Sequence, residues 1–278
     1  MTLVALRVAL VILALWLCAF PMQARSQETA PLPGEPGAGN ACVVLLHGLG
    51  RTYRSMDMIA SALRDAGYEA ISVDYPSRSK PIEALAVTAV PQGLQYCRNR
   101  HADRIHFVTH SMGGLVLRYY LASHPVPELG KVVMLSPPNQ GSEVADALVG
   151  TVVYDRINGP AGGQLGTGPD GIAARLGRID YTLGIITGNE QTAVDSWLAR
   201  QIPGQNDGKV SVARAKVEGM TDFLVLPVTH TFIVMDDKVI AQTLHFLRHG
   251  RFRREGIPTE AADLADRDAR HVAARSPH

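Results

Sequence analysis

Three residues of this sequence, Ser111, Asp207 and His230, are of the types that together turn a hydroxyl group into a nucleophile. A serine hydroxyl attacks a carbonyl poorly by itself, so it needs a base within hydrogen-bond reach. Histidine is the usual base, and a carboxylate beside it fixes its tautomer and stabilises its charged form. The chemistry that such a set performs is acyl transfer through a covalent intermediate on the serine.

Ser111 lies in the stretch RIHFVTHSMGGLVL, residues 104–117, which we interpret as a buried strand, a sharp turn and a helix. A strand that turns straight into a helix holds the residue between them in a strained conformation and lifts its side chain clear of the sheet. Strand and helix nearly touch there, so the residues two before and two after the serine should be small. Gly113 meets this demand, with Gly114 behind it, whereas Thr109 does not. The alternative role for Ser111 is a helix N-cap.

The base and the acid are chosen by where the later strands end. His230 follows the last expected strand, residues 221–228, and should reach the same sheet edge as Ser111; its alternative is a histidine in a surface loop. Asp207 comes after the strand expected at 181–188, in an N-D-G turn that suits the presentation of a carboxylate. A turn without catalytic duty is the alternative for Asp207. Glu190 and Asp195 remain alternative acids.

Neither a cofactor nor a metal site is predicted. His245 and His249 are four residues apart on the last expected helix, a spacing that can bind a metal, but no third ligand or H-E-x-x-H pattern accompanies them. We expect both to face solvent. The glycine-dense run GPAGGQLGTGPDG, residues 159–171, lacks the Gly-Lys-Ser/Thr ending of a phosphate-binding loop.

Apolar runs of strand length alternate with helical patterns along the chain. The expected strands are residues 41–46, 68–75, 104–110, 131–135, 181–188 and 221–228, and the expected helices are 55–66, 81–97, 112–122 and one that Asp236 or Asp237 would cap. Pro91 and Gly93 interrupt the second helix, so we expect a kink there. The alternation predicts an α/β fold with a doubly wound, mostly parallel sheet of about six strands flanked by helices.

Residues 142–178 lack clear periodicity and follow the expected strand 131–135. A long segment of this kind is usually functional or mobile, and here it would cover the site as a glycine-rich lid or cap. The alternative is a surface excursion without such a role.

Composition describes one ordinary globular domain. The chain has 278 residues, of which 46% are hydrophobic and 19% charged, and its formal net charge is +1. A nearly neutral body gives no electrostatic reason to expect a nucleic-acid partner. The sequence does not predict an oligomeric state.

The first 26 residues have the features of a secretory signal peptide. Arg7 precedes an apolar run from Val8 to Phe20, which Pro21 ends and small residues follow. We therefore expect an exported protein, periplasmic or secreted, with a linker at 27–40, a folded body at 41–250 and a flexible tail at 251–278. The alternative is an uncleaved segment that anchors the protein to a membrane.

Four motifs together resemble bacterial α/β-hydrolases of the lipase and esterase type. They are LLHGLG, VTHSMGG, the N-D-G-K-V loop and V-T-H before a final helix, and the likeness spans residues 41–248. The resemblance implies a minimal α/β-hydrolase fold, a triad of Ser111, Asp207 and His230, no cofactor, and carboxylic esters as substrates. It also implies an oxyanion hole formed by the backbone N–H groups of Leu49 and Met112.

Four apolar residues near the expected site bear on the substrate. Leu49, Met112, Leu148 and Val152 favour a lipid-like acyl chain and transient contact with lipid or membrane, but they can equally be core residues. Thioesterase, amidase and acyltransferase activities use the same triad, and a non-catalytic binding protein of the cell envelope is the alternative outside the enzymes. The H-G-x-G loop can also be a generic tight turn, and we expect His47 to be structural.

Removal of the signal segment leaves an even pair of cysteines, Cys42 and Cys97. In a fold of this kind they would fall at the same end of two neighbouring strands. A disulfide and two separate buried thiols are both open on this evidence.

Overall fold

The structure, a computed structural model, describes residues 39–150, 152–193, 199–200 and 202–254. The chain separates into two units, Met1–Glu35 and Pro36–His278, and the first lies outside the described residues. The expected signal segment and almost all of the expected linker and tail lie outside them too. No helix of the described part of the chain is long and apolar enough to cross a membrane.

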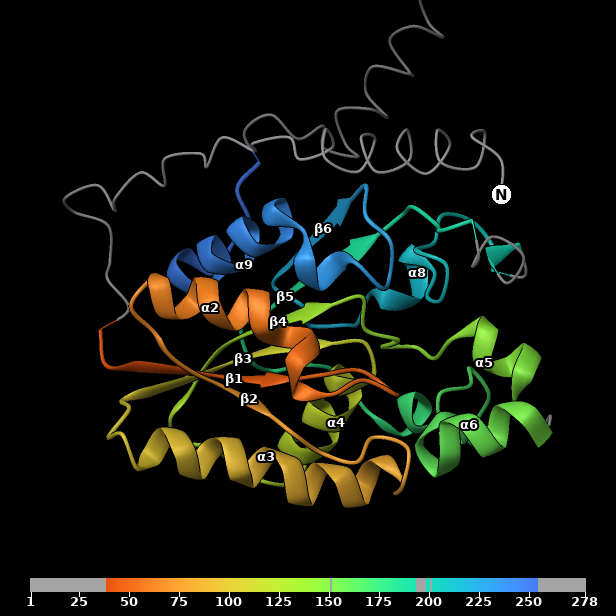
Figure 1. The fold of residues 1–278 in the computed structure, drawn as a ribbon, viewed down its shortest axis with the longest axis horizontal. Coiled ribbons are helices and arrows are strands. Elements are labelled where there is room, and N and C mark those ends of the chain that lie inside the picture. Colours follow the sequence, from red (N-terminus) through yellow and green to blue (C-terminus); the bar gives the residue numbers. More distant parts are fainter. Residues whose placement is uncertain (1–38, 151, 194–198, 201, 255–278) are drawn as a thin grey trace, which may run out of the picture. The chain divides into compact units, whose positions relative to one another are not determined.

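Six parallel strands form one sheet, as predicted (Figure 1). From edge to edge they are β2 (Glu69–Val73), β1 (Ala41–Leu46), β3 (Arg104–His110), β4 (Leu129–Leu135), β5 (Leu183–Gly188) and β6 (Asp222–Leu226). The direction in which the chain adds strands reverses between β1 and β3. Open parallel sheets bind ligands at the carboxyl ends of the strands that flank such a reversal.

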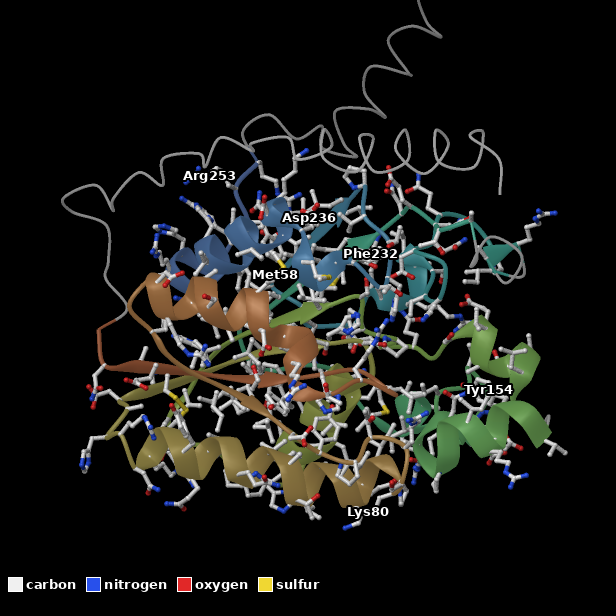
Figure 2. The ribbon with its side chains drawn as sticks, in the orientation of Figure 1. Met58, Lys80, Tyr154, Phe232, Asp236 and Arg253 are labelled. Carbon is white, nitrogen blue, oxygen red and sulfur yellow. A yellow bond between two sulfur atoms is a disulfide. The ribbon has the colours of Figure 1, made fainter. Side chains whose placement is uncertain are left out.

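Helices cover both faces of the sheet (Figure 1). One face carries α3 (Ile82–Arg98) and α4 (Met112–Leu121); the other carries α2 (Asp57–Asp65), which follows the 3-10 turn η1 (Tyr53–Met56), and α9 (Asp237–His249), which follows η3 (Ile233–Met235). The Asp236 side chain caps α9 by accepting hydrogen bonds from the N–H groups of Lys238 and Val239 (Figure 2). The sequence had left open which aspartate does this.

The two faces bury two separate apolar clusters, because successive side chains of a strand point to opposite sides. On β1, Cys42, Val44 and Leu46 belong to the cluster under α3 and α4. Ala41, Val43 and Leu45 belong to the cluster under α2 and α9. A strand buried on both faces reads as a continuous apolar run, which is why β1 could be recognised from sequence.

The helix expected at residues 81–97 is α3, which continues through Pro91 as one helix. The proline ring removes the N–H that would bond the carbonyl of Val87, and Val87 is 47% exposed, so water can reach that turn. A Cβ on Gly93 would lie 2.3 Å from Val44 Cγ1. The glycine therefore allows α3 to lie close against β1.

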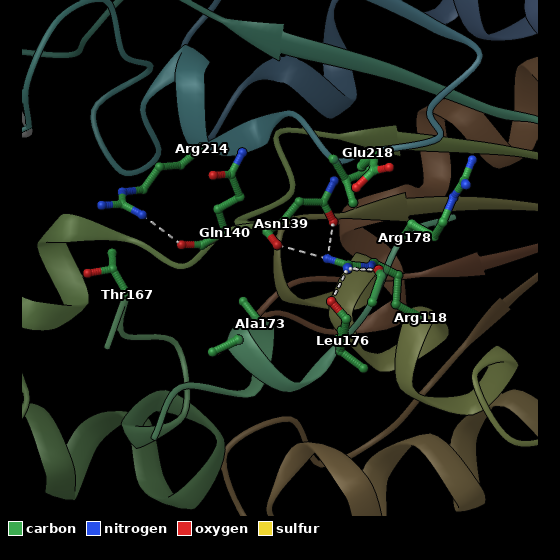
Figure 3. A pocket seen from close by; sticks show the side chains of 12 residues that line it. Arg118, Asn139, Gln140, Thr167, Ala173, Leu176, Arg178, Arg214 and Glu218 are labelled. Carbon is green, nitrogen blue, oxygen red and sulfur yellow. Dashed lines mark hydrogen bonds between the residues drawn. The ribbon is translucent and has the colours of Figure 1, made fainter. Parts of the chain in front are cut away.

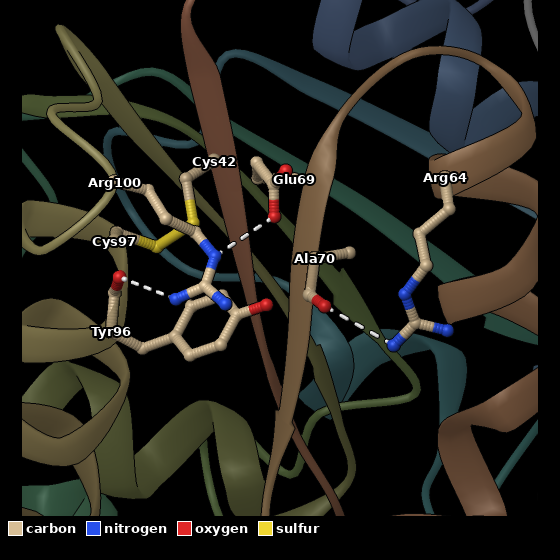
Figure 4. The surroundings of a disulfide bond; sticks show 7 residues. All are labelled: Cys42, Arg64, Glu69, Ala70, Tyr96, Cys97 and Arg100. Atoms are coloured by element: carbon tan, nitrogen blue, oxygen red, sulfur yellow. Dashed lines mark hydrogen bonds and ion pairs between the residues drawn. A yellow bond between two sulfur atoms is a disulfide. The ribbon is translucent and has the colours of Figure 1, made fainter.

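A disulfide joins Cys42 of β1 to Cys97 near the end of α3 (Figure 4). It resolves the choice that the sequence left open. Beside it, the Arg100 guanidinium lies 3.5 Å from the centre of the Tyr96 ring, and its Nε donates to Glu69 Oε2 at 3.1 Å. The bridge and the ion pair thus fix the end of α3 to the amino-terminal end of the sheet.

Residues 142–178 are more regular than their sequence suggested. They contain α5 (Glu143–Leu148), α6 (Val152–Gly163), which bears Tyr154 in Figure 2, and the 3-10 turn η2 (Ile172–Arg175). Gly159, with φ 62° and ψ −164°, breaks the helical geometry inside α6. A Cβ there would lie 1.8 Å from the backbone oxygen of Arg78. Glycine at this position therefore lets the segment lie against the loop after β2.

Candidate active site

Ser111 sits between β3 and α4 in the strained geometry expected of it, with φ 54° and ψ −127°. Its side chain makes no capping hydrogen bond to α4, so the N-cap alternative does not describe it. A Cβ on Gly113 would lie 2.6 Å from the carbonyl oxygen of Leu46 and 2.8 Å from that of His47. Only glycine lets α4 start this close to the end of β1.

Thr109 is accommodated by the second glycine of the helix. Its side chain is fully buried in the strand before Ser111. A Cβ on Gly114 would meet Thr109 Oγ1 at 3.4 Å, Met134 Sδ at 3.2 Å and Pro137 Cβ at 3.2 Å. The room that a small residue would leave at position 109 is thus supplied by Gly114.

The structure brings Ser111, His230 and Asp207 into one hydrogen-bonded row. His230 Nε2 lies 3.0 Å from Ser111 Oγ, and His230 Nδ1 lies 2.8 Å from Asp207 Oδ2. His230 is buried, with 4% of its surface exposed, so it is not a surface loop histidine. The three residues follow the carboxyl ends of β3, β5 and β6, which meet at one edge of the sheet.

The Asp207 carboxylate is buried and held from both sides. Its Oδ1 accepts hydrogen bonds from the N–H groups of Lys209 at 3.0 Å and Val210 at 2.8 Å. Burial by itself would raise the pKa of Asp207, but the charge and hydrogen bond of His230, the Ser136 side chain and the amide of Val210 outweigh it and hold that pKa below its usual value. The group is therefore a carboxylate at neutral pH. Of the alternative acids, Glu190 is exposed, and Asp195 lies outside the described residues.

The loop after β1 is shaped to aim a backbone N–H group. The carbonyl oxygen of Gly48 lies 2.9 Å from His47 Nδ1 and accepts a hydrogen bond from Arg51 N–H at 3.2 Å. Because N–H and C=O of a trans peptide point in opposite directions, the N–H of Leu49 points away from these two groups. A Cβ on Gly48 would lie 3.1 Å from Ser111 Cβ, so the loop passes directly beside the serine.

His47 holds this loop and does not touch Ser111 through any hydrogen bond of the described residues. Its ring stacks on Tyr75 with 4.1 Å between ring centres, and the Tyr75 hydroxyl donates to the His47 carbonyl. Burial lowers the pKa of His47, so the ring is neutral. Met112, the other expected N–H donor, is the first residue of α4 and is fully buried; N–H groups in a first helical turn have no acceptor within the helix.

One buried residue at this edge was not predicted to take part. His110, immediately before Ser111, places its Nε2 3.0 Å from the backbone oxygen of His230. Its ring centre lies 5.1 Å from that of His230. The available signal in the sequence was a histidine in a strand whose other inward positions are mostly apolar.

The remaining sequence candidates lie elsewhere. The rings of His245 and His249 lie 4.4 Å apart at a tilt of 42°, and His245 Nδ1 hydrogen-bonds the Arg251 backbone oxygen. No group of three metal-ligating side chains occurs among the described residues. Of the apolar candidates, Leu49 and Leu148 are half-buried, whereas Val152 is 79% exposed.

A pocket of about 570 Å³ lies on the side of α4 (Figure 3). Ser111, Asp207 and His230 are not among the residues that line it. Its wall includes Arg118, whose terminal nitrogens donate to the backbone oxygens of Asn139, Leu176 and Gly177. Arg118 therefore ties the helix after Ser111 to the segment before β5.

Residues 43–275 match the model of the alpha/beta hydrolase family, so the chain belongs to that family and is a hydrolase. Comparison with curated protein sequences found no match.

Solved structures with the same fold include lipases and esterases. The mature lipase BlEst2 of Bacillus licheniformis has 19% sequence identity and a TM-score of 0.61, over 80% of this chain and 96% of that one. The phospholipase PlaB of Legionella pneumophila has 17% identity and a TM-score of 0.60, over 76% and 58% of the two chains. The metagenomic carboxyl esterase MGS0156 has 18% identity and a TM-score of 0.57, over 77% and 71%. At these identities the likeness shows the shared fold.

Proposed function

We propose that the protein is a serine hydrolase of carboxylic esters, of the lipase and esterase type. The observation that carries the proposal is the hydrogen-bonded row from Asp207 through His230 to Ser111 at the carboxyl edge of the sheet. Asp207 supplies a charge that orients the imidazole, His230 supplies a base that reaches the hydroxyl, and the turn presents the hydroxyl of Ser111 to that base.

In the first half of the proposed reaction, Ser111 Oγ attacks the ester carbonyl carbon while its proton moves to His230 Nε2. The carbonyl oxygen becomes an oxyanion that the N–H groups of Leu49 and Met112 stabilise, and a donor of this kind is worth about 3 kcal/mol in the barrier. The tetrahedral intermediate then collapses. The bond to the alcohol oxygen breaks, and His230 gives its proton to the leaving alcohol.

In the second half, a water molecule replaces the alcohol. His230 takes a proton from the water, whose oxygen attacks the acyl carbon of the ester on Ser111. The same N–H groups stabilise the second oxyanion. Collapse releases the carboxylic acid and returns the proton to Ser111, so that the enzyme is unchanged and water is consumed.

Esters are favoured as substrates by two observations. The solved structures with the same fold are named as a lipase, a phospholipase and a carboxyl esterase. The half-buried Leu49 and Leu148 offer apolar surface on the loop after β1 and on α5. In this proposal α5 and α6 form the cap over an acyl chain.

We extend the proposal to export from the cytoplasm. The disulfide between Cys42 and Cys97 supports it, because such bonds persist in oxidising compartments. The sequence of residues 1–26 supports it independently. The mass and N-terminal sequence of the protein recovered from its native host distinguish a cleaved signal from a retained anchor.

The decisive experiment treats the folded protein with a fluorophosphonate and locates the adduct by mass spectrometry. We expect an adduct on Ser111 that is lost in His230→Ala. Ser111→Ala should abolish hydrolysis of p-nitrophenyl esters, whereas Ser123→Ala, at an exposed serine beyond the other end of α4, should not change it.

The alternatives give other results in the same experiment. Wild-type-like turnover by Ser111→Ala would overturn the assignment of the nucleophile. The absence of any adduct on folded protein would favour a binding protein without catalysis. Labelling at Ser111 without ester hydrolysis would direct the search to thioesters, amides or acyl transfer to an alcohol.

A further inference from the structure

Both backbone polar groups of His230, the proposed base, are hydrogen-bonded to residues of the site. The N–H of His230 donates to the backbone oxygen of Asp207 at 3.0 Å. Its carbonyl oxygen faces His110 Nε2, also at 3.0 Å. Asp207 therefore fixes one end of this residue through its backbone and the ring through its carboxylate, and the other end depends on His110.

We propose that His110 is a positioning residue that holds the loop carrying His230, so that His230 Nε2 stays within hydrogen-bond reach of Ser111 Oγ. The inference rests on the proposed function for its kinetic consequences, but the geometry of the contact does not depend on which substrate is cleaved.

The hydrogen bond fixes the tautomer of His110. A carbonyl oxygen only accepts, so Nε2 must carry the proton and Nδ1 must carry the lone pair. A Cβ on Gly48 would lie 3.2 Å from His110 Nδ1, so that nitrogen faces the loop after β1. One imidazole thus fills the space between that loop and the loop of the base, and it contacts both.

The proposed mechanism requires the His110 imidazole, which lies beside His230, to be neutral. Protonated His230 forms in each half of the proposed reaction, and its ring centre is 5.1 Å from that of His110. A second positive charge there would oppose that step. Burial, and next the charge of His230, lower the pKa of His110 to about 3, so it stays uncharged while His230 exchanges protons.

The contact arises from the position of β3 in the sheet and from the direction of the His110 side chain. His110 ends β3 and its side chain points to the face of α2 and α9, since Val108 on the same strand lies in the core beneath them. His230 comes from beyond β6, with β4 and β5 between the two strands. Because β3 is fixed in the middle of the sheet, His110 gives the last loop a rigid point of attachment.

The test compares His110→Phe, which keeps the ring and removes the donor, with His110→Gln, which carries an amide donor at similar reach. We expect His110→Phe to lower kcat for p-nitrophenyl esters by about 10- to 100-fold with KM changed less than threefold, because misplacement of a catalytic group by about 1 Å costs up to 100-fold. His110→Gln should recover most of the rate. If His110→Phe does not fold, His110→Asn replaces it, because its shorter side chain places the amide out of reach.

A second measurement is independent of turnover. In protein labelled with ¹⁵N-histidine, the Nδ1–H proton of His230 in its hydrogen bond to Asp207 should give a low-field resonance, assigned by its loss in His230→Ala. We expect this resonance to broaden or shift in His110→Phe and to return in His110→Gln.

The matched control is His106→Phe. His106 is the other buried histidine of β3, and its Nδ1 accepts from the Lys131 N–H at 2.7 Å, away from the site. This variant should leave kcat and the His230 resonance unchanged. If folded His110→Phe also keeps both, or if His110→Gln fails as completely as His110→Phe, the positioning role is wrong. If wild-type protein cleaves no ester, the proposed function fails, and the resonance alone decides the role of His110.

Discussion

At the scale of single residues, the hydrogen bonds of Asp207 determine which nitrogen of His230 carries the ring proton. Both N–H groups that Asp207 Oδ1 accepts come from the backbone of its own turn, at Lys209 and Val210. The other oxygen, Oδ2, faces Nδ1 of His230 at 2.8 Å. An amide at position 207 would therefore keep its oxygen on the backbone and turn its NH₂ group to the histidine.

Asp207→Asn is accordingly expected to reverse the tautomer of His230. The NH₂ group would donate to Nδ1, so the ring proton would move to Nε2, which could no longer accept from Ser111. We expect kcat to fall by about 10⁴-fold with little change in fold, as an exchange of this kind does in other serine hydrolases. Steady-state kinetics and circular dichroism measure the two effects. Glu190→Gln, at the exposed alternative acid, is the control, and a large loss there instead would reassign the acid.

The sequence could single out Ser111, Asp207 and His230, which the structure places in one hydrogen-bonded row, because residue type, chain order and position after a strand can be read locally. It did not predict the contact of His110 with the backbone of His230 or that of Gly114 with Thr109. The first contact crosses the sheet to a loop 120 residues away, and the second lies between strand and helix, so neither leaves a local pattern. A small residue was expected at position 109 in place of Thr109. The space that Thr109 needs is supplied by Gly114, five residues later, and this is seen only once α4 is packed against β3.

At the scale of elements, α3 and residues 142–178 were also harder to predict, because packing against other elements is not visible in the local sequence. A proline and a glycine marked α3 as an interrupted helix, but α3 is packed along its length against the sheet and fixed near its end by the disulfide, and it continues through Pro91. Short helices such as α5 give too few turns to show a period. The long apolar strands and the helices with one apolar stripe were the predictable part.

The attachment of α6 makes a prediction about its mobility. Gly159 needs φ 62° and lies directly on the backbone of Arg78, so Gly159→Ala should detach α6. We expect faster proteolysis within residues 143–163, seen by mass spectrometry of the first fragments, with the main melting temperature almost unchanged. Gly168→Ala, where a Cβ would meet nothing within 4 Å, is the matched control. Equal proteolysis of the two variants would contradict an anchoring role for Gly159.

At the scale of the whole molecule, buried histidines make the fold sensitive to acid. Burial lowers the pKa of His106 to about 4 and that of His110 to about 3, against about 6.5 for the unfolded chain. The unfolded state therefore binds more protons as soon as the pH drops below about 6.5. The stability that these neutral rings contribute is complete above that pH and is lost as the pH falls towards 4 and 3.

The free energy of unfolding should accordingly decrease by about 2 kcal/mol for each of these histidines between pH 7 and pH 5. Urea denaturation at the two pH values measures the change. In His106→Phe the decrease should be smaller by about 2 kcal/mol, because that variant has one proton fewer to take up on unfolding. An unchanged pH dependence in His106→Phe would contradict this origin of the acid sensitivity.

The order of the strands in the sheet also bears on how the chain folds while it is being synthesised. Beyond β1, the strands β3, β4, β5 and β6 cross the sheet in the order in which a ribosome makes them. Each can join the free edge left by its predecessor, so the growing chain never has to reopen a sheet to insert a strand. Ser111 is in place after the third strand, but His230 follows the sixth. On the proposed mechanism, a nascent chain therefore carries a folded and harmless serine until almost the whole sheet has been made.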